Sequence, residues 1–305
     1  MEYYFKLQFR RILRKLEAFG IQPVLGIVIA LLTFIVLSKL LYYKLIYANW
    51  VYVAIACSVL LSLGNQKRND LLKNIFSIKR FRQVRMLENI AIALPFSLYL
   101  IYEEEYRFVL GVLIAALLFA MVTFRSVLHF TIPTPFWKFP FEFIIGFRKF
   151  FLLILLGFFL TFQAIQVENP NLGVFSLGLQ FLIALVYYNQ AENPYFVWIF
   201  KGTNQKFLGR KMVDALVCSS IITFLIFSSL IFFFPSYFFV LIGVQLLGYV
   251  LLVAIILAKY SAYPSEMSLP QVLLYTLSLI FPPLFLVSIP IFYKQSTQKL
   301  KAFFR

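Results

Sequence analysis

Residues 237–258 read YFFVLIGVQLLGYVLLVAIILA, a stretch without a single charged side chain. About 20 residues of α-helix cross the hydrocarbon core of a bilayer, which is roughly 30 Å thick, because the helix rises about 1.5 Å per residue. This stretch is therefore long enough to form a membrane-spanning helix. Comparable apolar runs recur along the whole chain, and together they predict an all-α, polytopic membrane protein.

The composition of the chain argues against the other common classes of protein. Its 305 residues are 62% hydrophobic and 13% charged, with a mean hydropathy of +0.88, whereas an ordinary soluble domain is about 25% charged. A soluble core of this size could not hide so much apolar surface, and a disordered chain would carry much less of it. The short alternating segments of an outer-membrane barrel are absent from the sequence.

Eight apolar runs approach the length of a spanning helix. They cover residues 23–38, 46–63, 87–102, 108–124, 151–167, 172–189, 216–235 and 237–258. A further run, 272–293, is interrupted by Pro282, Pro283 and Pro290. These prolines predict either a broken hairpin that returns to the side from which it came or a kinked ninth span.

The positions of the Lys and Arg residues predict the orientation of the chain. Basic loops stay on the cytoplasmic side during membrane insertion. With the N-terminus inside and a hairpin at 272–293, every Lys and Arg except Lys39, Lys44 and Arg107 falls on the cytoplasmic side. A ninth crossing would move the basic C-terminal tail outside and weaken this asymmetry. We therefore expect a multi-pass protein of the cytoplasmic membrane with its N-terminus inside, and we favour the hairpin.

The runs follow one another without a segment that could form a separate soluble domain. We expect a single transmembrane domain over residues 1–305. Within it, residues 1–20 are predicted to form an amphipathic interfacial helix, residues 21–293 the spans and their loops, and residues 294–305 a basic cytoplasmic tail.

The interfacial helix is predicted from its periodicity. Phe5, Phe9, Ile12, Leu13 and Leu16 recur at helical spacing, and Lys and Arg residues fill the other face. Such a helix lies along the inner membrane surface, either as an anchor alone or also as a contact for a cytoplasmic partner. The net charge of +16 is spread over short segments beside the spans, where anionic lipid headgroups attract it. We expect contact with membrane lipids and none with nucleic acid.

Motifs for catalysis, cofactor binding and energy conversion are missing. The chain has one histidine, which excludes sites built from paired histidines. The segment GTNQKFLGRK, residues 202–211, lacks the GxxxxGK[ST] spacing of a phosphate-binding loop. The acidic residues fall in predicted loops or at span ends, so coupling to an ion gradient is disfavoured. We therefore expect that the chain is not an enzyme and that it has no catalytic residue and binds no cofactor or metal. Any active transport by this chain must use energy supplied by another chain.

One cytoplasmic loop is unusually aromatic. Residues 191–200 read AENPYFVWIF, in which Asn193 can cap a short helix and Pro194 suits its first position. The aromatic side chains of this loop fit either a membrane-interface belt or a projection that enters a groove of a partner.

The order of these segments resembles the membrane subunits of ATP-binding-cassette exporters, of the type-two class and its EcsB-like relatives. The resemblance rests on the basic N-terminal helix and on three loops, TIPTPFWKFPFEF (131–143), AENPYFVWIF (191–200) and AKYSAYPSEM (258–267). It implies a permease that pairs with a separate cytoplasmic ATPase through coupling elements at 131–143 and 192–201. The chain differs from a six-span exporter half by two or three extra crossings. We therefore do not assign the substrate path of that family to residues of this chain.

We therefore predict a permease subunit of an exporter whose partners are a cytoplasmic ATPase and membrane lipids, with a homodimer left open. The alternatives are a structural or assembly membrane protein and a membrane-embedded enzyme that acts on lipid-linked substrates. The candidates for coupling to the ATPase are Glu192, Pro194, Tyr195, Phe196, Trp198, Phe200, Phe136 and Trp137.

Overall fold

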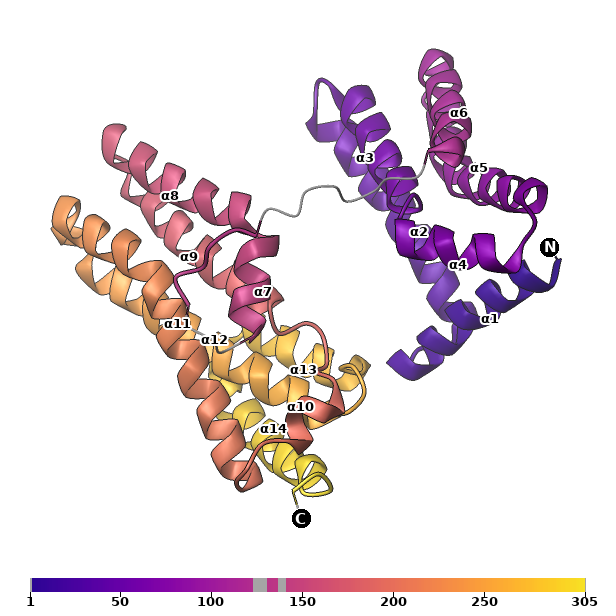
Figure 1. The fold of residues 1–305 in the computed structure, drawn as a ribbon. Coiled ribbons are helices and arrows are strands. Elements are labelled where there is room, and N and C mark those ends of the chain that lie inside the picture. The colour runs from indigo at the N-terminus through magenta and orange to yellow at the C-terminus, as the bar shows by residue number, and fades with distance from the viewer. Residues whose placement is uncertain (1, 123–130, 137–140, 305) are drawn as a thin grey trace. The chain divides into compact units, whose positions relative to one another are not determined.

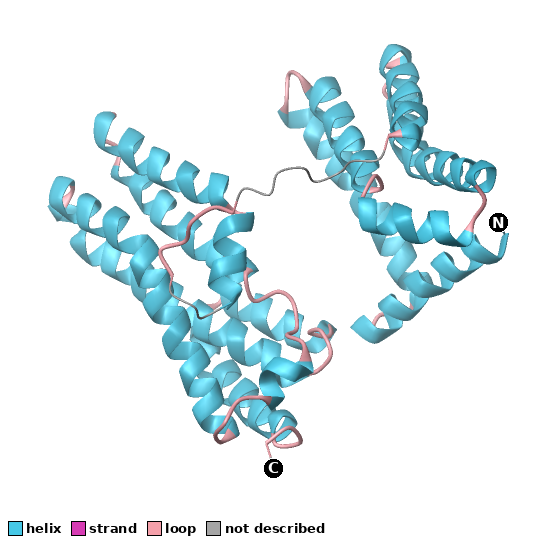
Figure 2. Ribbon diagram, viewed as in Figure 1, coloured by secondary structure: helices cyan, strands magenta, loops and turns pink. Residues whose placement is uncertain are grey.

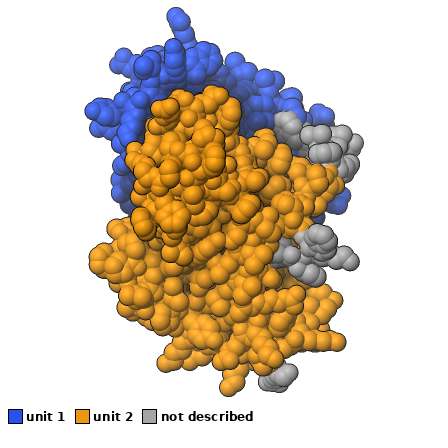
Figure 3. All heavy atoms as spheres, turned by 90° about the vertical axis from the view of Figure 1, so that its left-hand side faces the viewer, with its two compact units in different colours: residues 1–130 blue, residues 131–305 orange. Residues whose placement is uncertain are grey.

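The computed structural model describes residues 2–122, 131–136 and 141–304. Throughout these residues the regular structure is helical, without a strand (Figure 2), which confirms the all-α prediction. The chain divides into two compact units, residues 1–130 and residues 131–305, which Figure 3 colours separately. Each unit is described by itself below, and the single transmembrane domain stays a prediction.

The first unit contains six described helices, labelled in Figure 1. They are α1 (Glu2–Phe19), α2 (Pro23–Lys44), α3 (Ala48–Ser62), α4 (Gln66–Ile75), α5 (Ile78–Tyr102) and α6 (Tyr106–Met121). Helices α3, α5 and α6 pack on one another, and α2 lies against α3. The predicted amphipathic segment at the N-terminus is helical and forms α1, which contacts α2.

A buried arginine holds the core of the first unit together. Arg85 of α5 is fully buried and donates hydrogen bonds to the carbonyl oxygens of Leu63, at 2.5 Å, and Phe119, at 2.9 Å. These carbonyls belong to the C-terminal ends of α3 and α6, where the last turn of a helix lacks partners of its own. Asn89, one turn further along α5, donates to the carbonyl of Ala116 at 2.9 Å. The two side chains thus satisfy backbone groups on neighbouring helices.

The second unit contains the remaining helices. They are α7 (Phe141–Lys149), α8 (Phe151–Gln166), α9 (Pro170–Val186), α10 (Pro194–Trp198), α11 (Asn204–Phe233), α12 (Phe238–Ala262), α13 (Leu269–Ile280) and α14 (Phe285–Leu300), with the 3₁₀ turns η1 (Pro235–Tyr237) and η2 (Pro282–Leu284). Helix α12 is central, because α9, α11, α13 and α14 all pack against it. Helices α8, α9 and α11 run side by side (Figure 1).

Close approach of α9 and α12 depends on a residue without a side chain. A Cβ atom at Gly248 of α12 would overlap the ring of Phe181 on α9. Polar side chains add contacts between other pairs of helices in this unit. Gln245 donates to Thr223 of α11 at 3.1 Å, and Thr161 of α8 bonds Ser176 of α9 at 2.8 Å. Small residues and buried hydrogen bonds are the usual means by which helices associate in membranes.

The helices match the predicted apolar runs in position more closely than in length. Each of the eight runs largely coincides with one helix. By length and composition, four of the described helical segments can cross a membrane, namely Pro23–Lys44, Ile78–Tyr102, Asn204–Phe233 and Pro235–Ala262. A fifth is counted if α7 and α8, which meet at a 74° bend, form one broken span. Helices α3, α6 and α9 are apolar but shorter, so the number of eight or nine spans is not confirmed.

Two of the apolar runs lie within longer helices. Helix α5 begins at Ile78 and α11 at Asn204, well before the apolar runs that they contain. Thr203 explains the start of α11, because its hydroxyl caps the helix by accepting a hydrogen bond from the backbone N–H of Lys206. The basic ends of both helices therefore extend beyond the apolar part of the span.

The proline-rich segment near the C-terminus forms two helices. Helices α13 and α14 are separated by the turn η2, and Pro290 lies inside α14. The expected basic tail is helical as far as Leu300, which is buried. Ser296 donates to the carbonyl of Leu257 at 2.7 Å, and Phe304 contacts the ring of Phe207. This tail therefore packs against α11 and α12.

Candidate functional site

The short helix α10 begins as the sequence predicts. The Asn193 side chain accepts a hydrogen bond from the backbone N–H of Tyr195 at 3.0 Å, and Pro194 occupies the first turn. Val197 is the buried residue of this helix. It fixes one face of α10 in the core of the second unit, so the side chains on the other faces are presented outward.

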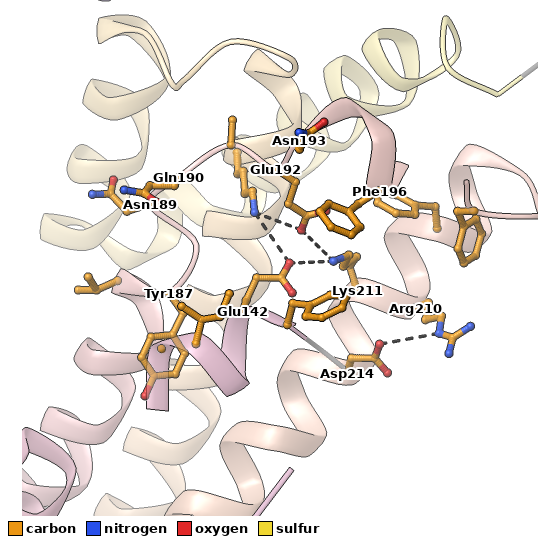
Figure 4. A pocket seen from close by; sticks show the side chains of 18 of the residues that line it. Glu142, Tyr187, Asn189, Gln190, Glu192, Asn193, Phe196, Arg210, Lys211 and Asp214 are labelled. Atoms are coloured by element: carbon orange, nitrogen blue, oxygen red, sulfur yellow. Dashed lines mark hydrogen bonds and ion pairs between the residues drawn. The ribbon is translucent and has the colours of Figure 1, made fainter. Parts of the chain in front are cut away.

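A cluster of four charged side chains lies just before α10. The Lys211 ammonium of α11 is 2.8 Å from Oε1 of Glu142, on α7, and 2.8 Å from Oε1 of Glu192. Lys259 of α12 places Nζ 3.4 Å from the same Glu192 oxygen, and the Tyr260 hydroxyl donates to it at 2.9 Å. Figure 4 shows Glu142, Glu192 and Lys211 converging on one point. The cluster joins α7, α11, α12 and the segment that leads into α10.

The cluster is held inside the protein. Lys259 is 3% exposed and Glu142 is 9% exposed. The Lys259 ammonium also lies over the rings of Tyr188 and Tyr260, 5.4 Å from each centroid, a contact in which the ring faces attract the cation. Charges buried in this way are retained only when opposite charges and hydrogen bonds compensate them.

The Glu192 carboxyl shows how strong this compensation is. Burial acts to raise its pKa, but a hydrogen bond with the Glu142 carboxyl and the charges of Lys211 and Lys259 outweigh burial and lower that pKa well below its usual range. Glu192 is therefore ionised at neutral pH. As a carboxylate it accepts hydrogen bonds from Lys211, Lys259 and Tyr260.

The cluster borders a cavity of about 840 Å³ within the second unit (Figure 4). One face of α7 and one face of α11 form part of its wall, with residues spaced three and four apart on each helix. The α7 residues are Glu142, Ile145, Gly146 and Lys149, and the α11 residues are Phe207, Arg210, Lys211 and Asp214. Residues 186–187 and 189–193, Phe196 of α10 and residues 199–201 form other parts of the wall.

The predicted coupling residues have different environments. Tyr195, Phe196 and Trp198 are exposed on α10, with Trp198 at 69%. Phe200 packs against Phe207 and Phe304. Two candidates come from the loop 131–143. Phe136 is buried against Phe143 and Phe147, so its ring is not exposed for a partner, and Trp137 lies outside the described residues.

The ionic partners of Glu192 could not be found from the sequence. Lys211 and Lys259 lie 19 and 67 positions from Glu192, and Glu142 lies 69 positions from Lys211. The sequence places Lys259 in a cytoplasmic loop after the run 237–258, but it belongs to the last turn of α12 and is buried. The only local signal was helical spacing, because residues 207, 210, 211 and 214 share one face of α11.

The fold and the long apolar helices define a broad class, that of all-helical proteins with helices long and apolar enough to span a membrane. Below this class no relationship is shown, since no protein family, no characterised protein and no solved structure matches the chain. Within the part of the chain that the structure describes, no three His, Cys, Asp or Glu side chains gather as metal ligands would.

Proposed function

We propose that the chain is the permease subunit of an ATP-binding-cassette exporter, energised by a separate cytoplasmic ATPase that docks on α10. The observation that supports this proposal is the two-sided character of α10. One side is anchored through buried Val197, while Tyr195, Phe196 and Trp198 are exposed. Large aromatic side chains are the residues that most often dominate binding at protein interfaces.

The attachment of α10 suits a mechanical connection between a partner and the membrane helices. Glu192 stands two residues before the first residue of α10 and is ion-paired to Lys211 of α11 and Lys259 of α12. Helices α11 and α12 belong to two of the segments long enough to cross a membrane. A push on α10 would therefore reach both helices through short, charge-assisted contacts.

We further propose that the chain crosses the cytoplasmic membrane eight times with its N-terminus inside, and that α10 faces the cytoplasm. The asymmetry of Lys and Arg residues supports this orientation. The apolar helices α3, α6 and α9, with 15, 16 and 17 residues, are close to the lower limit of about 17 residues for a spanning helix. Short spans are accommodated by local thinning of the bilayer.

The proposal is tested by co-purification. The tagged chain should retain an ATPase from its own cell when it is extracted in a mild detergent. Replacement of Phe196 and Trp198 by Ala should weaken this association by about 30-fold, because loss of an aromatic anchor typically costs about 2 kcal/mol or more. The matched control replaces Phe232 and Phe239, which are exposed aromatic residues at the other end of α11 and the start of α12, and should keep the wild-type ratio.

Two results would count against the proposal. If the Phe196 and Trp198 variant retains the ATPase as well as the control does, these rings belong to a membrane-interface belt. If no ATPase accompanies the wild-type chain, a structural or assembly role replaces the permease.

A further inference from the structure

The cavity beside the ionic cluster contains more basic than acidic side chains. Its acidic residues are each matched by a basic partner. Glu142 and Glu192 face the ammonium groups of Lys211 and Lys259, and Asp214 has Arg210 at 3.8 Å. The cluster therefore brings no excess negative charge to the cavity.

Two further cations line the same cavity. Lys149, at the end of α7, and Lys201, after α10, are exposed lining residues. Among the described residues neither forms an ion pair. The Lys149 ammonium rests over the ring of Phe150, 5.2 Å from its centroid. The cavity thus has two ammonium groups available for an anion.

Apart from the charged residues and the polar side chains of Asn189, Gln190 and Asn193, much of the wall is apolar. Side chains of α7, α9 and α10 contribute, together with the residues that follow α7 and α10. They are Phe141, Ile145, Phe150, Val186, Phe196 and Ile199. A volume of about 840 Å³ lies within the range of pockets that enclose small organic ligands, about 300–1,000 Å³. A small inorganic anion would leave most of this apolar surface uncovered.

We propose that this cavity binds the headgroup of an anionic phospholipid. The phosphate group pairs with Lys149 and Lys201, and the glycerol backbone with the first part of the acyl chains covers the apolar wall. A lysine is a point charge that suits phosphate oxygens. The site follows from the charges and the wall of the second unit, so it does not depend on the permease proposal.

The test uses the full chain, purified in a mild detergent and examined by native mass spectrometry. Dioleoyl phosphatidylglycerol, which is anionic, is titrated against dioleoyl phosphatidylcholine, which has no net charge. We expect the anionic lipid to bind at least about tenfold more tightly. The double variant Lys149→Gln and Lys201→Gln should lose this preference, and it should fold because neither lysine has an ionic partner among the described residues.

Two further variants separate the cavity from its surroundings. Lys206→Gln removes an exposed charge of α11 that does not line the cavity, and it should leave the preference unchanged. Ile145→Asn keeps every charge but makes the apolar wall polar, and it should weaken binding of both lipids.

Three outcomes would overturn the proposal. Equal loss of binding in Lys206→Gln and in the Lys149 and Lys201 variant would mean that the lipid is attracted by the basic surface in general. Equal affinity for the two lipids would show that the two lysines do not select an anionic headgroup. Full competition by soluble glycerol 3-phosphate would assign the site to a free phosphate compound. Because each readout is lipid binding to the isolated chain, failure here leaves the ATPase association unaffected.

Discussion

The Nζ atom of Lys211 lies 2.8 Å from Oε1 of Glu192. Lys211 belongs to α11, whereas Glu192 belongs to the segment before α10. This contact therefore connects α10 to α11, one of the long apolar helices. The same ammonium reaches Glu142 on α7. One lysine therefore fixes three parts of the second unit, and its removal is the most direct way to loosen α10.

Replacement of Lys211 by Met should lower the free energy of unfolding by about 3 kcal/mol, because removal of one partner from a buried ion pair leaves the other charge uncompensated. The matched control is Arg210→Met, since Arg210 is exposed and its pair with Asp214 spans 3.8 Å. An exposed helical pair of this kind contributes about 0.5 kcal/mol or less. Unfolding is followed by titration from mild detergent into SDS, and equal effects of the two variants would contradict the structural role of Lys211.

The depressed pKa of Glu192 predicts a pH-dependent contribution to stability. In the unfolded chain a glutamate has a pKa of about 4.3. Because the folded-state pKa lies lower, the ionised carboxylate stabilises the fold fully above the unfolded value, and this contribution is lost as the pH falls through the folded value.

The difference in melting temperature between wild type and Glu192→Gln should therefore be large at pH 7 and shrink between about pH 5 and pH 3. The exposed residue Glu266 provides the control, and Glu266→Gln should behave like wild type at every pH. A Glu192→Gln difference that is constant over this range would show that the ion pairs do not depend on ionised Glu192.

The contact between Gly248 and Phe181 predicts a large effect of a small substitution. Gly248→Val places a side chain against the ring of Phe181 and should cost about 1–3 kcal/mol, which is typical of overpacking. Gly243→Val, on the same helix, is the control because a Cβ atom there meets open space. Measurement of the melting temperature in detergent distinguishes the two, and similar values would mean that α9 and α12 are not closely packed.

The sequence predicts the helices of this protein better than it predicts their contacts. Apolar runs and helix caps are local features, and both α12 and the start of α10 at Asn193 were found from them. Glu192 was predicted as a candidate for coupling to the ATPase, but its neighbours Lys211 and Lys259 lie 19 and 67 positions further along the chain. A lysine in a basic segment has the same local pattern whether it is solvated or paired, so only the packing of α11 and α12 reveals the cluster.

The proposed topology predicts the accessibility of single cysteines. In a chain with Cys57 and Cys218 replaced by Ala, we expect Asn74→Cys and Gln205→Cys to resist an impermeant thiol reagent in intact cells, because both positions lie in basic segments predicted to be cytoplasmic. Ile46→Cys, at an exposed position between α2 and α3 and at the predicted outer end of the run 46–63, should react. Labelling of residue 74 or 205 from outside would contradict the proposed orientation.

Hydrogen bonds of Tyr4 fasten α1 to α5, and their loss should increase local opening of α1. The Tyr4 hydroxyl donates to Oε1 of Glu88 on α5 at 2.7 Å and accepts a bond from Arg68 at 3.2 Å, while Arg68 is also ion-paired with Glu88. Tyr4→Phe removes both bonds of the hydroxyl but keeps the ring, which packs edge-on against Phe76.

We expect Tyr4→Phe to raise the rate of amide hydrogen exchange in α1 by about tenfold, because bonds to charged groups are worth about 1.5–3 kcal/mol. The matched control is Tyr3→Phe, since Tyr3 is 72% exposed and has no hydrogen bond to a described residue. If α1 were held only by lipid, the two variants would exchange at the same rate. Faster exchange in Tyr4→Phe alone would show that α1 is fastened to α5, so that a partner bound to α1 could act on a helix long enough to cross the membrane.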